Sequence, residues 1–186
     1  MHGKLPETPE LTAISEREKT IGVSLDYQRD MAAASPGAAL KLAEIARIVR
    51  EGQSVPEPIA MMAALGATMA EDCGDCVQIY VNLALKAGVD KAIVQAALEN
   101  RLGDMPIDLK LGFCFGRTVS ENDPMLLEKG AALEARFGRK ALVDLSLVIA
   151  LARFYPTVKR ALGHSRTCAE ARNDARGPNR SRCAFL

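Results

Sequence analysis

The sequence contains no tryptophan, and only 4% of its 186 residues are aromatic. So few aromatic side chains leave no platform on which nucleic-acid bases could stack, and a formal net charge of +1 gives no electrostatic basis for binding phosphates. We therefore expect no nucleic-acid partner. Apolar residues still make up 48% of the chain, mostly as Ala, Leu, Val, Ile and Met, and this composition favours closely packed helices.

The sequence also lacks an uninterrupted apolar run of the roughly 18 residues that a membrane helix requires. Its polar start, with Pro6 and Pro9, lacks the apolar core of a signal peptide. These absences predict a cytoplasmic protein with no membrane partner. The five cysteines are an odd number, so we expect reduced thiols with one reactive pair rather than a framework of structural disulfides.

The reactive pair is expected in the stretch Glu-Asp-Cys-Gly-Asp-Cys, where Cys73 and Cys76 stand three positions apart. A Cys-x-x-Cys pair can close a small disulfide. At the start of a helix, the unpaired N–H groups and the positive end of the helix dipole stabilise a thiolate. Asp72 is predicted to be the N-cap of that helix, and Asp75 the acid of its capping box. The predicted chemistry is therefore redox chemistry.

No segment alternates apolar and polar residues as strands do, so the predicted fold class is all-α. The helix at 56–70 is apolar nearly all round and must be buried, either within the domain or between subunits. With the cysteine helix it is predicted to form a central antiparallel hairpin. Helices are expected at residues 15–31, 36–50, 56–70, 73–88, 91–101, 106–120, 124–137 and 140–162.

The order of an apolar helix, Cys-x-x-Cys, a second helix, Ala-Gly-Val-Asp at 87–90 and a third helix resembles the AhpD-like alkylhydroperoxidase and carboxymuconolactone decarboxylase superfamily. Ser-Pro at 35–36 and the stretch at 136–145 look like further landmarks. The resemblance covers residues 35–163. It implies an AhpD-like helical domain of about six helices, with Cys-x-x-Cys at the start of a central helix. Residues 1–34 would form an N-terminal arm and residues 164–186 a basic, disordered tail.

The resemblance implies that Cys76 attacks a peroxide and forms a sulfenic acid, which Cys73 resolves to a disulfide. The sequence departs from the family's pattern in two respects that bear on this mechanism. The family's histidine, four positions after the second cysteine, is Tyr80 here, which donates hydrogen bonds but is a poor proton acceptor at neutral pH. The family's glutamate on the preceding helix is replaced in the region 60–62. Glu71 or Asp75 could stand in for it, although carboxylates beside a cysteine raise the pKa of the thiol.

The leading hypothesis is a thiol-dependent peroxidase or disulfide oxidoreductase that acts on organic hydroperoxides, with Cys76, Cys73, Tyr80 and Glu71 as catalytic residues. It would use no cofactor and take electrons from a dithiol such as a lipoyl-bearing protein. One alternative is a non-catalytic oligomeric protein that has lost the His/Glu relay. Another is an enzyme like carboxymuconolactone decarboxylase. A metal site is not expected, because no second Cys-x-x-Cys or His pair exists.

Two further expectations concern packing. Cys114, between two phenylalanines, is predicted to be an unreactive core thiol. The apolar faces of the helices at 56–70 and 73–88, and of the segment 142–151, exceed what a small domain covers alone. We therefore predict a homo-oligomer with the cysteine pair near an interface, and the resemblance implies a trimer or hexamer.

Overall fold

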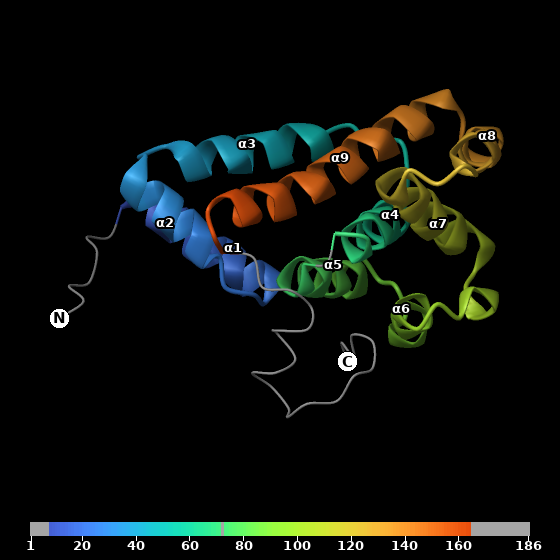
Figure 1. Ribbon diagram of the computed structural model, residues 1–186, viewed down its shortest axis with the longest axis horizontal. Helices are drawn as coiled ribbons and strands as arrows, with labels where there is room; N and C mark the ends of the chain where they lie inside the picture. The colour runs from blue at the N-terminus through green and yellow to red at the C-terminus, as the bar shows by residue number, and fades with distance from the viewer. Residues whose placement is uncertain (1–7, 72, 165–186) are drawn as a thin grey trace.

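A computed structural model of the chain describes residues 8–71 and 73–164 (Figure 1). In these residues all regular structure is helical, which confirms the predicted all-α class. The helices are α1 (Pro9–Ile21), α2 (Asp26–Ala34), α3 (Ala38–Arg50), α4 (Glu57–Met69), α5 (Gly74–Lys86), α6 (Lys91–Leu98), the 3-10 helix η1 (Leu102–Asp104), α7 (Ile107–Glu121), α8 (Leu126–Phe137) and α9 (Arg139–Ala161).

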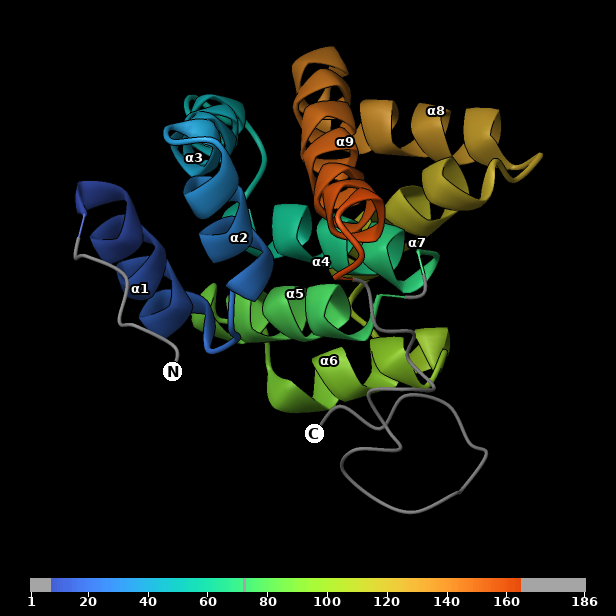
Figure 2. The same ribbon diagram turned by 60° about the vertical axis from the view of Figure 1, so that its left-hand side comes forward.

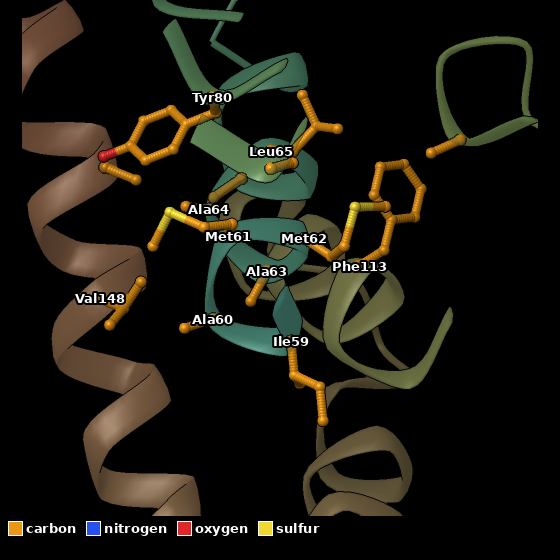
Figure 3. Packing of buried hydrophobic residues seen from close by; sticks show 14 of the residues in the cluster. Ile59, Ala60, Met61, Met62, Ala63, Ala64, Leu65, Tyr80, Phe113 and Val148 are labelled. Atoms are coloured by element: carbon orange, nitrogen blue, oxygen red, sulfur yellow. The ribbon is translucent and has the colours of Figure 1, made fainter. Parts of the chain in front are cut away.

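The centre of the fold is α4, whose residues from Ile59 to Thr68 are all buried. It packs against α5, α7 and α9 (Figure 3). The contact with α7 is the tightest, because glycines remove the side chains between the two backbones. A Cβ atom added at Gly116 would lie 1.9 Å from the Ala63 carbonyl oxygen, and one added at Gly66 would lie 2.2 Å from the Phe113 carbonyl oxygen. The predicted pairing with the cysteine helix is present, but α7 approaches α4 more closely.

The burial of α4 within its own chain removes one reason for predicting an oligomer. Its apolar faces are covered by helices of the same chain, so they do not require a subunit interface. Large apolar side chains are exposed instead on α3 and α9, which lie side by side (Figure 1). Ile48 is 56% exposed on α3 and Leu147 is 50% exposed on α9, with Ile45 and Val143 nearby in sequence and also exposed.

The single helix predicted at 15–31 is wrong, because two helices, α1 and α2, occupy this region. Gly22 ends α1 with a left-handed φ of 70°, and its N–H donates to the Glu18 carbonyl over 2.8 Å. A glycine in this conformation is a common helix stop. The prediction of one helix overlooked this stop signal.

Both N-terminal helices pack on their own chain. Ile14 and Tyr27 are buried in one cluster with Ala39 and Leu42 of α3, and the Glu10 carboxylate accepts hydrogen bonds from backbone N–H groups at the start of α3. Figure 2 shows α1 and α2 beside α3 and α5. The division into an arm at 1–34 and a domain at 35–163 stays a prediction. The predicted tail lies almost wholly outside the described residues.

The last helix, α9, is long and apolar enough to meet a length-and-composition test for crossing a membrane. Core helices of other proteins meet the same test. Leu145, Ile149 and Ala152 of α9 are buried in the main core, and the helix contacts α3, α4, α7 and α8. These contacts are those of a core helix in a packed helical domain.

Candidate functional site

Cys73 and Cys76 are joined as a disulfide at the start of α5, with their Cα atoms 5.3 Å apart. Cys73 is the N-cap residue and Cys76 lies in the first turn, so the positive end of the helix dipole is at the pair. The predicted N-cap, Asp72, is wrong: α5 begins at Gly74, and Cys73 occupies the cap position without a side-chain cap. Asp72 itself lies outside the described residues.

Glu71 is tied to α9 by two arginines. Arg153 Nε donates to one carboxylate oxygen over 2.6 Å, and Arg160 donates to the other over 2.7 Å and to the Glu71 carbonyl over 3.0 Å. Burial alone would raise the pKa of Glu71, but the hydrogen bonds and charges of the two arginines outweigh it and lower that pKa. Glu71 therefore stays ionised and holds α9 against the start of α5.

Asp75 likewise binds a cation from α9, rather than capping α5 as predicted. Lys159 Nζ donates to its carboxylate over 2.8 Å, and the Lys159 side chain is only 6% exposed. The two carboxylates beside the cysteines are thus matched by three cations, Arg153, Lys159 and Arg160. Each of these two carboxylates is therefore paired, which reduces its repulsion of a thiolate.

A cavity of about 530 Å3 lies beside the second cysteine, between α1, α2 and α3 on one side and α5 and α9 on the other. Of the predicted catalytic residues, Cys76 and Tyr80 line it, and Cys73 and Glu71 do not. Because Cys76 is only 2% exposed, the cavity is the space from which a small molecule could approach its sulfur. The lining residues are Glu16, Arg17, Thr20, Ile21, Leu25, Tyr27, Gln28, Ala43, Ala46, Arg47, Arg50, Glu51, Cys76, Ile79, Tyr80, Leu83 and Tyr155.

Tyr80 lies one helical turn after Cys76, and its ring points from α5 toward α9 (Figure 3). Burial raises the pKa of its hydroxyl further above the ordinary value, and the negative form of neighbouring Tyr155 would act in the same direction. Tyr80 is therefore a neutral phenol that can donate a hydrogen bond into the cavity. It cannot replace the family's histidine as a proton acceptor at neutral pH.

Several residues at the site were missed from the sequence. Arg153, Lys159 and Arg160 lie 82 to 89 positions from the carboxylates they bind, so no local motif reveals the contact. The spacing of seven positions between Arg153 and Arg160 was a usable signal, because it places both on one face of a helix. The cavity wall from α1 and α2 was missed because that segment was interpreted as an arm.

The other thiols are separate from this site. Cys114 is a free, half-buried cysteine on α7, and burial raises the pKa of its thiol, as an unreactive packing role requires. Cys168 and Cys183 lie outside the described residues. Within residues 8–71 and 73–164, no group of three or more His, Cys, Asp or Glu side chains is arranged to hold a metal ion.

No protein-family model matches the sequence, and no curated protein sequence matches it. Solved structures do resemble the fold. The debrominase Bmp8, a cysteine-to-alanine variant in complex with 2,3,4-tribromopyrrole, superposes with a TM-score of 0.72 at 16% identity over 93% of each chain. Its apo form gives 0.72 at 17% identity, over 91% of this chain and 92% of that one. Bmp8 has the AhpD-like helical fold, so the fold predicted from the resemblance is confirmed.

Proposed function

We propose that this protein is a thiol-dependent oxidoreductase that reduces an organic hydroperoxide at Cys76, with Cys73 as the resolving cysteine. One observation carries the proposal: a Cys-x-x-Cys disulfide at a helix start whose second sulfur lines a cavity large enough for a small organic molecule. The pairing of Glu71 and Asp75 with cations of α9 supports thiolate formation, because it reduces the repulsion between these acids and the sulfur.

In the proposed reaction, the Cys76 thiolate attacks the outer oxygen of the hydroperoxide. The O–O bond breaks, a proton from solvent completes the alcohol, and Cys76 becomes a sulfenic acid. The Cys73 thiolate then attacks the Cys76 sulfur, and the oxygen leaves as water once protonated. The disulfide that results is the form present in this structure. The substrate has gained two electrons, and the two thiols have lost them.

Tyr80 would assist by hydrogen bonding to the alkoxide-like oxygen that develops as the O–O bond breaks. Its raised pKa keeps it protonated throughout the neutral range. Because it lines the same cavity as Cys76, both can reach one bound molecule. In this proposal electrostatic stabilisation of the thiolate replaces the family's acid/base relay.

A dithiol would close the cycle by exchange with the disulfide. Both cysteines are almost fully buried, at 1% and 2% exposure. A sulfur that is reached through a cavity suits a slender reductant, such as the lipoyl arm of a protein, better than a dithiol fixed on a broad protein surface. We therefore keep a lipoyl-bearing protein as the proposed electron donor.

A second candidate is reductive dehalogenation, which the likeness to Bmp8 with its bound tribromopyrrole favours. An aryl carbon–bromine bond would become a carbon–hydrogen bond, bromide would leave, and the two thiols would be oxidised to the disulfide. This reaction has the same electron balance as the peroxidase reaction and needs the same pair of cysteines.

We also propose a homo-oligomer in the cytoplasm, assembled through the exposed apolar side chains of α3 and α9. Ile45, Ile48, Val143 and Leu147 would be covered in such an interface. Light scattering at micromolar concentration tests this, because a monodisperse 20.0 kDa particle would contradict it.

The deciding experiment measures turnover of cumene hydroperoxide with dihydrolipoamide. Replacing Cys76 by Ser should reduce the rate at least about 100-fold, because serine cannot form the sulfenic acid or the disulfide. Replacing Cys114 by Ser is the matched control and should leave the rate unchanged. Equal rates for wild type and the Cys76 variant would contradict the proposal. An activity that survives thiol alkylation would favour a decarboxylase-like enzyme. The absence of hydroperoxide turnover would favour dehalogenation if bromide is released from a brominated pyrrole, and a non-catalytic protein if it is not.

A further inference from the structure

Two polar side chains at the cavity beside Cys76, those of Arg17 and Gln28, have buried atoms without hydrogen-bond partners. Nε and Nη2 of Arg17 and Oε1 of Gln28 are shielded from solvent and make no hydrogen bond. Gln28 is 2% exposed, and its other amide end donates to the Tyr27 hydroxyl over 2.7 Å. All three residues line the cavity.

Arg17 is partly exposed, but two of its guanidinium nitrogens are buried and unpaired, which is unusual for a group that always carries a charge. Burying an ion without a counter-ion is costly, and buried charges are normally paired. The planar fork of Arg17 suits two oxygens of one anionic group. The free end of the Gln28 amide could bind the same molecule, since an amide can turn its oxygen or its nitrogen toward a ligand.

The acids around the cavity do not neutralise Arg17. Glu16 binds Lys19 over 2.6 Å, and Glu51 binds Arg47, which also pairs with Glu44. Arg50 adds another positive charge to the lining. Burial raises the pKa of the Tyr155 hydroxyl, while the charges of Arg50 and Arg17, which line the same cavity, act against that rise.

The rest of the lining is suited to an apolar molecule. The ring of Tyr80 and the aliphatic side chains of Ile21, Leu25, Ala43, Ala46, Ile79 and Leu83 contribute to its wall. A volume of about 530 Å3 falls within the range of small-molecule sites. Such a pocket would hold a ligand of one or two rings, or an equivalent aliphatic chain, with one charged end.

We infer that the cavity beside Cys76 binds a small organic anion, an aromatic or aliphatic body with a carboxylate or similar acidic group, and that Arg17 binds the acidic group. The apolar body then lies along α5 with its reactive end toward Cys76. This inference rests on the proposed function only in naming the ligand as the substrate. The binding itself requires no reaction.

Calorimetric titration of the full chain with 2-naphthoate and its neutral isostere 2-naphthamide tests the inference. We expect the wild type to bind the acid at least roughly tenfold more tightly than the amide, as for a charge-assisted hydrogen-bonded pair. In Arg17→Gln this preference should disappear, while Arg17→Lys should retain part of it. Arg101→Gln is the matched charge control, because Arg101 pairs with Glu99 on the surface away from the cavity.

The midpoint of thermal unfolding distinguishes a ligand-binding role of Arg17 from a structural role. Removing an unpaired buried charge should leave the midpoint of Arg17→Gln equal or higher, whereas removing a structural contact would lower it. Equal affinities for acid and amide, no binding of either probe, or a preference that survives in Arg17→Gln would overturn the inference.

The double variant Cys73→Ser/Cys76→Ser distinguishes this inference from the proposed function. It should still prefer 2-naphthoate, because the cysteines do not bind the acidic group. In the wild type, a preference for the acid without hydroperoxide turnover would refute the proposed function alone. Turnover without that preference would refute the inference alone.

Discussion

The contact between α4 and α7 and the cavity beside Cys76 differ in how the chain fills space. At the contact, Gly66, Gly112 and Gly116 bring two backbones together until no side chain fits between them. At the cavity, about 530 Å3 remains empty, and Arg17 and Gln28 face it with unpartnered polar atoms. Buried polar atoms without partners reduce stability, so their place at the cavity supports the ligand site inferred above.

The largest expected effect of a single change lies at the filled contact. Gly116→Ala would place a Cβ atom 1.9 Å from a backbone oxygen of α4, so the two helices must separate. We expect a loss of about 3 kcal/mol or more in the free energy of unfolding, measured by denaturant titration. The matched control is Gly130→Ala on α8, where the nearest atom would lie at an ordinary 3.7 Å. Similar losses for both variants would mean that α4 and α7 are not in backbone contact.

A smaller effect is expected at the cavity wall. Tyr80→Phe removes the hydroxyl that we propose to stabilise the leaving oxygen, and keeps the ring that packs against α4 and α9. Hydroperoxide turnover should fall about tenfold, which corresponds to about 1.4 kcal/mol of transition-state stabilisation. The free energy of unfolding should change little. Turnover equal to that of wild type would leave Tyr80 as a packing residue only.

The smallest effect is expected at the salt bridges between Glu71 and α9. Glu71→Gln removes both arginine pairs, and because Arg153 and Arg160 are more than 40% exposed and can be hydrated, the loss should be about 1 kcal/mol at pH 7. The pKa of Glu71 is lowered in the fold, so its contribution is present above the ordinary value of 4.5 and disappears as the pH falls through the folded pKa.

Denaturant titrations at pH 7 and at pH 3 test this dependence. The difference between wild type and Glu71→Gln should shrink at the lower pH. Glu128→Gln serves as a control, because Glu128 pairs with Lys129 at an exposed position. A difference that is the same at both pH values would contradict an ionised, paired Glu71.

The two regions also differ in how far the sequence predicts them. Helical spacing is a local property, so the all-α class, the helix that follows Cys73 and the stacking of Tyr80 on Cys76 could be predicted. The salt bridge between Asp75 and Lys159 spans 84 positions and has no local signal. The break at Gly22 did have a local signal, the glycine itself, which the prediction of one helix overlooked.

Local sequence patterns also fail to predict the cavity and the tight contact between α4 and α7. Glycines on α4 and α7 predict only that side chains are absent, and do not identify which helix approaches which. Arg17 gave no signal, because an arginine on an amphipathic helix is usually hydrated. Only the packing of α1 and α2 on α3 and α5 places it at the wall of a cavity that Cys76 shares.

The central claim is that Cys73 and Cys76 are oxidised together by a molecule that enters the cavity. The most direct test treats the reduced protein with one equivalent of cumene hydroperoxide, alkylates the remaining thiols and measures the mass of the peptide that contains both cysteines. The account predicts that this peptide loses two hydrogens and resists alkylation, while Cys114 is alkylated after unfolding. A fully alkylated Cys73–Cys76 peptide, with the peroxide unconsumed, would contradict it.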